Sequence, residues 1–258
     1  MSTRDTAWAP GTPCWVDVAV GDVDSARLFY EGLFDWSVES GPPEFGGYSN
    51  AFKKGRYAAG ITPQMTAGEP AAWTTYFAVA DIDGVAAKVT ASGGNVVADP
   101  MDVADLGKMA LATDPAGAMF GLWQAGKHTG YTIANEPGTV IWTENMSTDW
   151  VVNKGFYQKV FGWDYDDMSD ETFKYATFQV EGRVAGGLGE IAESADATGA
   201  HWSVYFAVED TDQAVDQAVR LGGSVIRPPW DTPQGRMAIV TDTQGASFAM
   251  MSAPAEGY

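Results

Sequence analysis

The sequence predicts an α+β fold in which four βαβββ units form two similar domains in tandem. Three observations predict this architecture. The second half of the chain repeats the first half with few changes of spacing, which indicates duplicated structural units. Each half contains the order strand, helix, three strands twice. The chain has 258 residues, 45% of them hydrophobic, which is enough for one or two well-packed domains of roughly 150 residues each.

The repeat is visible in aromatic, glycine and aspartate positions at nearly constant offsets. The offset is 127 residues near the beginning (142 minus 15), 129 in the middle (202 minus 73) and 128 near the end (242 minus 114). The matched positions include Trp15 with Trp142, Asp22 with Asp149, Phe29 with Phe156, Trp36 with Trp163, Trp73 with Trp202, Gly93 with Gly222, and Asp114 with Asp242. We therefore expect homologous domains at residues 11–125 and 138–253. A polar segment near residues 126–138, with Gly130, Pro137 and Gly138, is expected to join them.

The first unit opens with residues 14–20, which alternate in character as a half-buried strand does. Asp22 is placed to cap a helix, because a short acidic side chain accepts hydrogen bonds from the free N–H groups of the first turn. The helix is expected to bury Val23, Ala26, Phe29, Tyr30 and Leu33. Extended segments follow at residues 36–40, 48–53 and 57–63.

The second unit repeats this order. Residues 74–79 form a strand that leads through Asp81 into a helix with Val85 and Val89 on one face. Gly93 and Gly94 end that helix, since glycine adopts the left-handed backbone that commonly follows a helix. Strands are expected at residues 96–98, 109–113 and 119–123, with turn residues at 114–117.

Composition excludes several classes of partner. The 15 lysines and arginines against 34 aspartates and glutamates give a formal net charge of −19. Such a surface repels nucleic-acid backbones and anionic bilayers, so we expect neither as a partner. Neutral or cationic small molecules are favoured at long range. A tandem chain can make internally the contact that a dimer would make, so both a monomer and a homodimer are compatible with the sequence.

The beginning of the chain and the cysteine content predict a cytoplasmic protein. No apolar stretch follows Met1, and no run approaches the roughly 18 apolar residues that a membrane span needs. The single cysteine, Cys14, allows no disulfide within the chain and is expected to be buried and inert.

The repeated pattern resembles the vicinal oxygen chelate superfamily, which includes glyoxalases, bleomycin-resistance proteins and extradiol dioxygenases. The resemblance rests on Asp22 followed by Phe29-Tyr30, on Phe34 before Trp36, and on the closing turn Asp114-Pro115-Ala116-Gly117. Both halves carry it, and the whole chain looks most like tandem-domain bacterial members described as glyoxalase-like or as hydroxylases. The resemblance implies that two units curl their sheet into a cup that holds the ligand on its concave face.

The resemblance also implies where a metal ion would be held. The ligand positions of the family are occupied by Trp15, Thr74 and Gly121 in the first half and by Trp142, Ser203 and Ala249 in the second. An indole, a glycine and an alanine offer no lone pair to a divalent ion. We therefore predict no metal ligands and no cofactor. A mixed site built from His201, Asp17 and Glu144 remains an alternative at this point.

Strand alternation assigns side chains to the expected cups. The predicted ligand-binding residues are Trp15, Asp17, Thr74, Tyr76, Gly121, Trp123, Trp142, Glu144, His201, Ser203, Tyr205, Ala249 and Met251. Aromatic walls, a carboxylate and a small residue in each cup suit a planar organic ligand. An alternative is that the indoles fill a cup without a ligand and that the carboxylates accept their N–H groups. His201 has no counterpart in the first half, which favours the second cup as the active one.

Three functions follow from this sequence. The first is metal-independent binding of a small planar or cationic molecule, as bleomycin-resistance proteins do. The second is a metal-free enzyme acting on a carbonyl or polyketide-like substrate, with Glu144 or Asp17 as general base and Tyr205 or His201 as proton donor. The third is a metal-dependent glyoxalase or dioxygenase.

Overall fold

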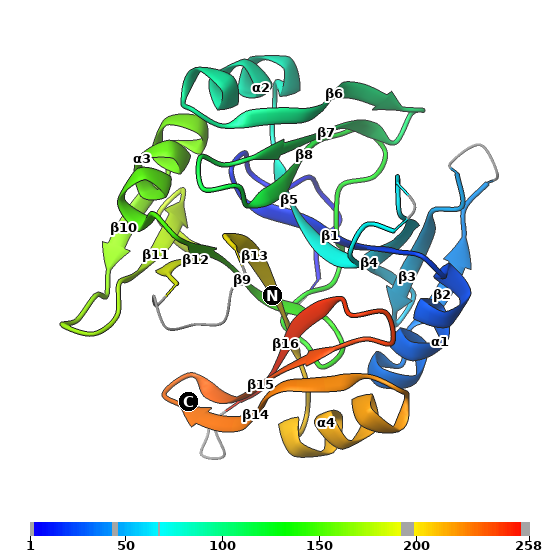
Figure 1. The fold of residues 1–258 in the computed structure, drawn as a ribbon. Coiled ribbons are helices and arrows are strands. Elements are labelled where there is room, and N and C mark those ends of the chain that lie inside the picture. The colour runs from blue at the N-terminus through cyan, green and yellow to red at the C-terminus, as the bar shows by residue number, and fades with distance from the viewer. Residues whose placement is uncertain (1–2, 43–45, 67, 192–198, 254–258) are drawn as a thin grey trace.

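Two eight-stranded sheets form the protein, as the computed structural model shows for residues 3–42, 46–66, 68–191 and 199–253 (Figure 1). The first sheet has the strand order β2-β3-β4-β1-β5-β8-β7-β6. Its elements are β1 (Pro13–Val20), α1 (Val23–Phe34), β2 (Ser37–Ser40), β3 (Ser49–Lys53), β4 (Arg56–Pro63), β5 (Ala72–Ala78), α2 (Ile82–Ala91), β6 (Asn95–Val103), β7 (Gly107–Thr113) and β8 (Met119–Ala125).

The second sheet repeats this arrangement with the order β10-β11-β12-β9-β13-β16-β15-β14. Its elements are β9 (Val140–Ser147), α3 (Trp150–Phe161), β10 (Asp164–Asp167), β11 (Tyr175–Val180), β12 (Arg183–Glu190), β13 (His201–Ala207), α4 (Thr211–Arg220), β14 (Ser224–Thr232), β15 (Gly235–Thr241) and β16 (Ser247–Ser252). The predicted α+β fold with four βαβββ units is therefore confirmed.

Each helix begins at an aspartate whose carboxylate accepts a backbone N–H three residues later. Asp22 accepts from Ser25 N at 3.0 Å, which confirms the predicted cap. The same bond occurs at the other three helices, from Gly84 to Asp81, from Val152 to Asp149 and from Gln213 to Asp210. Such a cap satisfies an N–H group that the helix itself leaves unpaired.

The four helices lie between the two sheets. Residues of α1 and α4 share one core with β1, β4, β13 and β16, and residues of α2 and α3 share a second core with β5, β8 and β12. In Figure 1 the α1–α4 pair and the α2–α3 pair lie on opposite sides of the central strands β5 and β13. At the centre the sheets touch directly, with the Trp73 and Phe206 rings 5.1 Å apart. Each sheet therefore keeps one face without helices, which we call its inner face.

A buried hydrogen bond ties each half to the other. Tyr157 of α3 donates from its hydroxyl to Asp114 Oδ2 at 2.9 Å and accepts from Trp202 Nε1 at 2.8 Å. The repeat supplies the same arrangement in the opposite direction, in which Tyr30 donates to Asp242 at 3.0 Å. The two aspartates were expected only as turn residues, and their other oxygens do accept the turn N–H groups of Ala118 and Ala246.

The connecting segment differs from the expectation of a polar linker. Tyr131, Ile133 and Ala134 are buried. Tyr131 donates from its backbone N–H to Cys14 O at 2.8 Å and from its hydroxyl to Pro13 O at 2.6 Å. The glycine and proline content of the segment pointed to a loop, but the segment packs along β1 and contributes to the core.

Strand β6 is longer than predicted. It covers Asn95–Val103 rather than residues 96–98, and its register against β7 shifts twice near Pro100. Proline is tolerated there because β6 is the edge strand of the sheet and needs no donor on its outer side. Among the described residues, no helix has the length and apolar character required to cross a membrane.

We expect the Tyr157→Phe variant to lower the free energy of unfolding by about 1–3 kcal/mol, because it leaves the Trp202 N–H unpaired and removes one donor from buried Asp114. Urea denaturation measures this change. Tyr165→Phe is the matched control, since the Tyr165 hydroxyl donates to the backbone carbonyl of half-buried Lys154 rather than to a buried carboxylate. Equal losses in both variants would contradict a special role for the buried pair.

Candidate functional site

The inner face of the first sheet carries a chain of hydrogen bonds that ends on Asp17. Trp15 Nε1 donates to the Tyr48 hydroxyl at 2.7 Å, and that hydroxyl donates to Asp17 Oδ2 at 3.2 Å. Tyr76 also hydrogen-bonds to the Asp17 carboxylate. Only 4% of Asp17 is exposed, so two phenols replace the water that a carboxylate would otherwise bind. We call these four residues the first network.

The inner face of the second sheet carries the same chain of bonds. Trp142 Nε1 donates to the Tyr175 hydroxyl at 3.2 Å, and Tyr175 donates to Glu144 Oε2 at 2.8 Å. Tyr205 donates to Glu144 Oε1 at 2.5 Å. We call these four residues the second network. Both carboxylate oxygens therefore accept a phenolic hydrogen bond, and the predicted residues Trp142, Glu144 and Tyr205 are brought together.

Glycines on neighbouring strands make room for the phenol rings. A Cβ atom at Gly60 of β4 would lie 2.0 Å from the Tyr48 hydroxyl, and one at Gly187 of β12 would lie 2.0 Å from the Tyr175 hydroxyl. Gly121 was expected to leave space for a ligand. The structure instead places the Tyr76 ring over it, since a Cβ atom there would lie 2.0 Å from that ring.

Burial raises the pKa values of the ionisable side chains in the first network. It raises the pKa of Asp17 to about 7, against the opposing effect of the Tyr76 and Tyr48 hydrogen bonds. Burial and the neighbouring carboxylate also raise the pKa values of Tyr48 and Tyr76 well above their usual range. The same two causes raise those of Tyr175 and Tyr205 in the second network. All four phenols therefore stay protonated and act as donors near neutral pH.

Aromatic side chains of the protein itself fill the first inner face. The His128 ring lies 4.5 Å from the Trp15 ring and 4.8 Å from the Tyr57 ring, and both contacts are edge-on. Trp123 Nε1 donates to the His128 carbonyl at 2.9 Å. Burial lowers the pKa of His128 to about 4, so its imidazole is neutral at physiological pH. The first network is thus covered by His128 of the connecting segment, Tyr57 of β4 and Trp123 of β8.

Smaller residues replace two of these covering groups on the second inner face. Val184 stands 127 residues after Tyr57, and Met251 stands 128 residues after Trp123. Trp142 and Glu144 are correspondingly half-buried, whereas their counterparts Trp15 and Asp17 are buried. Tyr48 and Tyr175 are half-buried in both halves. The second network is therefore the more accessible one.

The remaining predicted residues lie around the two networks. Thr74 pairs with Asp17 and Ser203 pairs with Glu144 in the strand register, and Ala249 pairs with Tyr205. The His201 ring contacts the carbonyl oxygen of Gly199 through Nδ1 at 2.9 Å and has no hydrogen bond to Glu144 among the described residues. Met251 is half-buried at the end of β16.

Sequence reasoning missed Tyr48, Tyr175 and His128. The two tyrosines lie at the same 127-residue offset as the two tryptophans (175 minus 48), so the repeat itself contained the signal. His128 had no comparable signal, because it belongs to the segment predicted to join the two domains.

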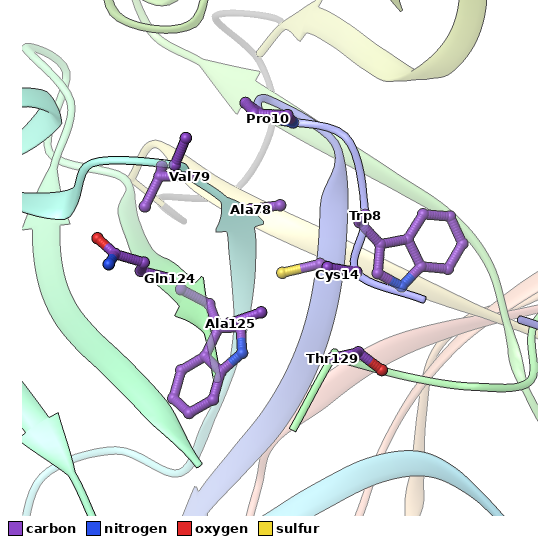
Figure 2. Close-up of a pocket in the computed structure, with 11 residues that line it drawn as sticks. Trp8, Pro10, Cys14, Ala78, Val79, Gln124, Ala125 and Thr129 are labelled. Carbon is purple, nitrogen blue, oxygen red and sulfur yellow. The ribbon is translucent and has the colours of Figure 1, made fainter. Parts of the chain in front are cut away.

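Two hollows lie away from the carboxylates. One, of about 340 Å³, is lined mainly by apolar side chains and includes Cys14, which Figure 2 shows between Trp8 and the strand that carries Ala78. Cys14 is buried as expected, and burial raises the pKa of its thiol. The other hollow, of about 520 Å³, is lined by Trp142 and Val184 and also by Arg183. Neither is lined by Asp17 or Glu144.

The side chains at the expected metal positions do not fit a divalent ion. Trp15 and Trp142 use their indole N–H groups as donors to phenols, and Gly121 lies beneath a tyrosine ring. Within the described ranges, no three histidine, cysteine or acidic side chains come together. The mixed site of His201, Asp17 and Glu144 is wrong, because the two carboxylates lie on inner faces of different sheets, with the helices between those sheets.

Comparison with known proteins agrees with this architecture. The family model "Glyoxalase/Bleomycin resistance protein/Dioxygenase superfamily" matches residues 14–122 and 147–250. A Mycobacterium tuberculosis protein named "Putative glyoxylase CFP32" is 39% identical over 255 residues, covering 96% of this chain and 97% of the relative. "Anthracycline biosynthesis protein DauV" of a Streptomyces species is 36% identical over 261 residues, covering 95% and 94%. The Mn(II)-bound glyoxalase of Novosphingobium aromaticivorans shares the fold, with a TM-score of 0.66 at 12% identity, covering 98% of this chain and 83% of that one.

We expect the raised pKa of Asp17 to appear in the pH dependence of stability. Between the unfolded value near 4 and the folded value of about 7, only the folded protein holds this proton, so stability falls as pH rises through that window. At roughly 1.4 kcal/mol per pKa unit, the loss amounts to at most about 4 kcal/mol.

The measurement is the difference in free energy of unfolding between the wild-type protein and Asp17→Asn from pH 4 to pH 8. The difference should shrink or reverse with rising pH and become constant above pH 7. Asp99→Asn, at an exposed position, controls for the loss of one acidic group. A difference that stays constant with pH in the Asp17 variant would show that the buried carboxylate titrates normally.

Proposed function

Because this chain belongs to the glyoxalase/bleomycin resistance protein/dioxygenase superfamily, we propose that it binds a small planar organic molecule on the second inner face without a metal ion. One observation carries the proposal. The two halves contain the same network of tryptophan, carboxylate and two tyrosines. Within the described residues, aromatic side chains cover the first network, whereas Val184 and Met251 stand at two of the matching positions around the second. Trp142 and Glu144 of the second network are left half-buried on the face where the family holds its ligand.

The side chains around the second network suit an aromatic ring. Trp142 and Tyr175 present rings next to the carboxylate, and the exposed Phe173 ring is stacked on Tyr175 at 5.7 Å. Stacking on such rings contributes about 0.5–1.5 kcal/mol for each pair beyond the area that it buries. Glu144 accepts hydrogen bonds and therefore selects a ligand that carries a hydroxyl or an N–H group.

The relatives support a planar ligand. The name of one 36% identical relative links it to the biosynthesis of anthracyclines, which are planar aromatic compounds. That relative matches almost the whole chain, so the likeness includes the second half where the network is accessible. Recognition by stacking and hydrogen bonds requires no metal, which agrees with a donor set that does not fit one.

We expect the protein to bind 1,8-dihydroxyanthraquinone with a Kd below about 1 mM, measured by quenching of tryptophan fluorescence and by calorimetry. Trp142→Ala and Tyr175→Phe should each weaken binding about tenfold or more, because they remove a stacking surface and a fixed hydroxyl. Tyr48→Phe is the matched control on the covered face and should change Kd less than twofold. Absence of binding, or equal effects of Tyr48→Phe and Tyr175→Phe, would reject this assignment.

A second candidate function is metal-free proton abstraction with Glu144 as general base. The observation that favours it is the pair of protonated phenols on this carboxylate, since Tyr205 can return a proton to an oxygen of the substrate. A carbon acid such as anthrone, whose C10 protons lie next to two rings and opposite a carbonyl, matches the shape of the proposed ligand.

If Glu144 is a base, the protein should accelerate exchange of the anthrone C10 protons with D2O, followed by NMR. Glu144→Gln should then lower the exchange rate by about 100-fold or more, as loss of a general base does. Glu190→Gln, an exposed position at the end of β12, is the control. Exchange that is unchanged in the Glu144 variant would leave binding as the only function of this face.

A further inference from the structure

A cationic side chain lies on the second inner face in register with the second network. Arg227 of β14 pairs with Ile239 of β15, and Ile239 pairs with Ala249 of β16. Ala249 pairs with Tyr205 of β13, and Tyr205 pairs with Trp142 of β9. Residues that face one another across neighbouring strands point to the same side of a sheet. Arg227 therefore belongs to the row that contains Tyr205 and Trp142.

The first sheet contains the same row without the cation. Its members, from β6 to β1, are Ala98, Leu111, Gly121, Tyr76 and Trp15. Ala98 thus occupies the register position of Arg227, and Met101 occupies that of Trp230. The arginine is a feature of the accessible face alone, as expected for a group that serves a ligand rather than the fold.

Local backbone geometry holds the Arg227 side chain in place. The strand register shifts between Arg227 and Trp230, where Pro228 and Pro229 interrupt the ladder of the edge strand. This places the guanidinium carbon 3.7 Å from the centre of the Trp230 ring. A guanidinium stacked on an indole is pre-oriented and keeps its N–H groups free for a further partner.

The positive charge of Arg227 is not balanced by a neighbouring acid. Within the part of the chain that the structure describes, no carboxylate oxygen lies within 4.0 Å of its nitrogens, although the net charge of the protein is −19. The positive charge of Arg227 also affects Tyr205 of the second network. Burial and Glu144 raise the pKa of Tyr205, and the charge of Arg227 offsets part of that rise.

We propose that Arg227 binds an acidic oxygen, a carboxylate or a phenolate, of the planar ligand on the second inner face. The inference rests on the proposed binding function and specifies the ligand class as hydroxylated aromatic acids. Glu144 accepts a hydrogen bond from a hydroxyl at one end of such a ligand, and Arg227 donates to its acidic oxygen at the other end. Ile239 and Ala249 form the apolar floor between them.

The span agrees with a fused-ring ligand. Glu144 lies on β9 and Arg227 lies on β14, and β13, β16 and β15 separate these two strands. This corresponds to four strand spacings or roughly 19 Å along the sheet. The length of the Arg227 side chain covers part of this distance between the strands. The overall negative charge repels an acidic ligand at long range, so a local cation is required to hold it.

Two probes that differ in one group test the proposal. They are 1,8-dihydroxyanthraquinone and its 3-carboxylate, each titrated into the wild-type protein, Arg227→Met and Arg220→Met. Arg220→Met removes the same charge from α4, where the Arg220 side chain bonds to Gln217. The wild-type protein should bind the carboxylate at least fivefold more tightly than the neutral compound. Arg227→Met should abolish this preference, whereas Arg220→Met should retain it.

The outcomes separate this inference from the proposed function. If the neutral compound binds but Arg227→Met keeps the preference for the carboxylate, or the wild-type protein has none, the role of Arg227 is refuted and the binding function stands. If neither compound binds the wild-type protein, both are refuted. Thermal denaturation of Arg227→Met with an unchanged midpoint would confirm that its loss of preference reflects a lost contact and not a damaged fold.

Discussion

The hydrogen bond between a helix tyrosine and the turn aspartate of the opposite half is the constraint on which the architecture depends. Tyr157 bonds to Asp114 and Tyr30 bonds to Asp242, so each half supplies the donor for one bond and the acceptor for the other. These bonds lie within the helix layer and keep the two sheets back to back. The inner faces then point away from each other, and neither is needed to bury the main cores. This separation allows one face to be filled while the other stays accessible.

The two networks contain the same hydrogen bonds but differ in how deeply they are buried. In both, a carboxylate accepts hydrogen bonds from two phenols and an indole donates to one of them. On the first face, His128 and Trp123 exclude water, and the Asp17 carboxylate becomes hard to ionise. On the second face, Val184 and Met251 stand at the matching positions of Tyr57 and Trp123, and the Glu144 carboxylate is half-buried. The difference lies in the covering residues and not in the polar groups themselves.

Much of the fold was predictable from the sequence because its signals are local. Asp22 before an apolar helical face, and Asp114 before Gly117, specify a cap and a turn through contacts within a few residues. Strand alternation likewise predicted that Trp142, Glu144 and Tyr205 share one face, and in the structure hydrogen bonds connect them. Tyr175 and His128 were missed because their partners are distant in the chain. Tyr175 of β11 reaches Glu144 of β9 across the intervening strand β12, and His128 comes from a segment whose burial depends on β1. The role of Gly121 was misjudged because only the fold shows that a ring lies above it.

The filled first face affects how substitutions can accumulate in this protein during evolution. Its buried aromatic cluster contributes stability that does not depend on any bound compound. Glu144 is half-buried and Arg227 is exposed, so exchanging these two side chains removes little of the interior and costs little folding free energy. A duplicated architecture in which one copy carries stability leaves the other free to acquire new specificities by single substitutions. Diversity among such tandem proteins should therefore concentrate in the second copy.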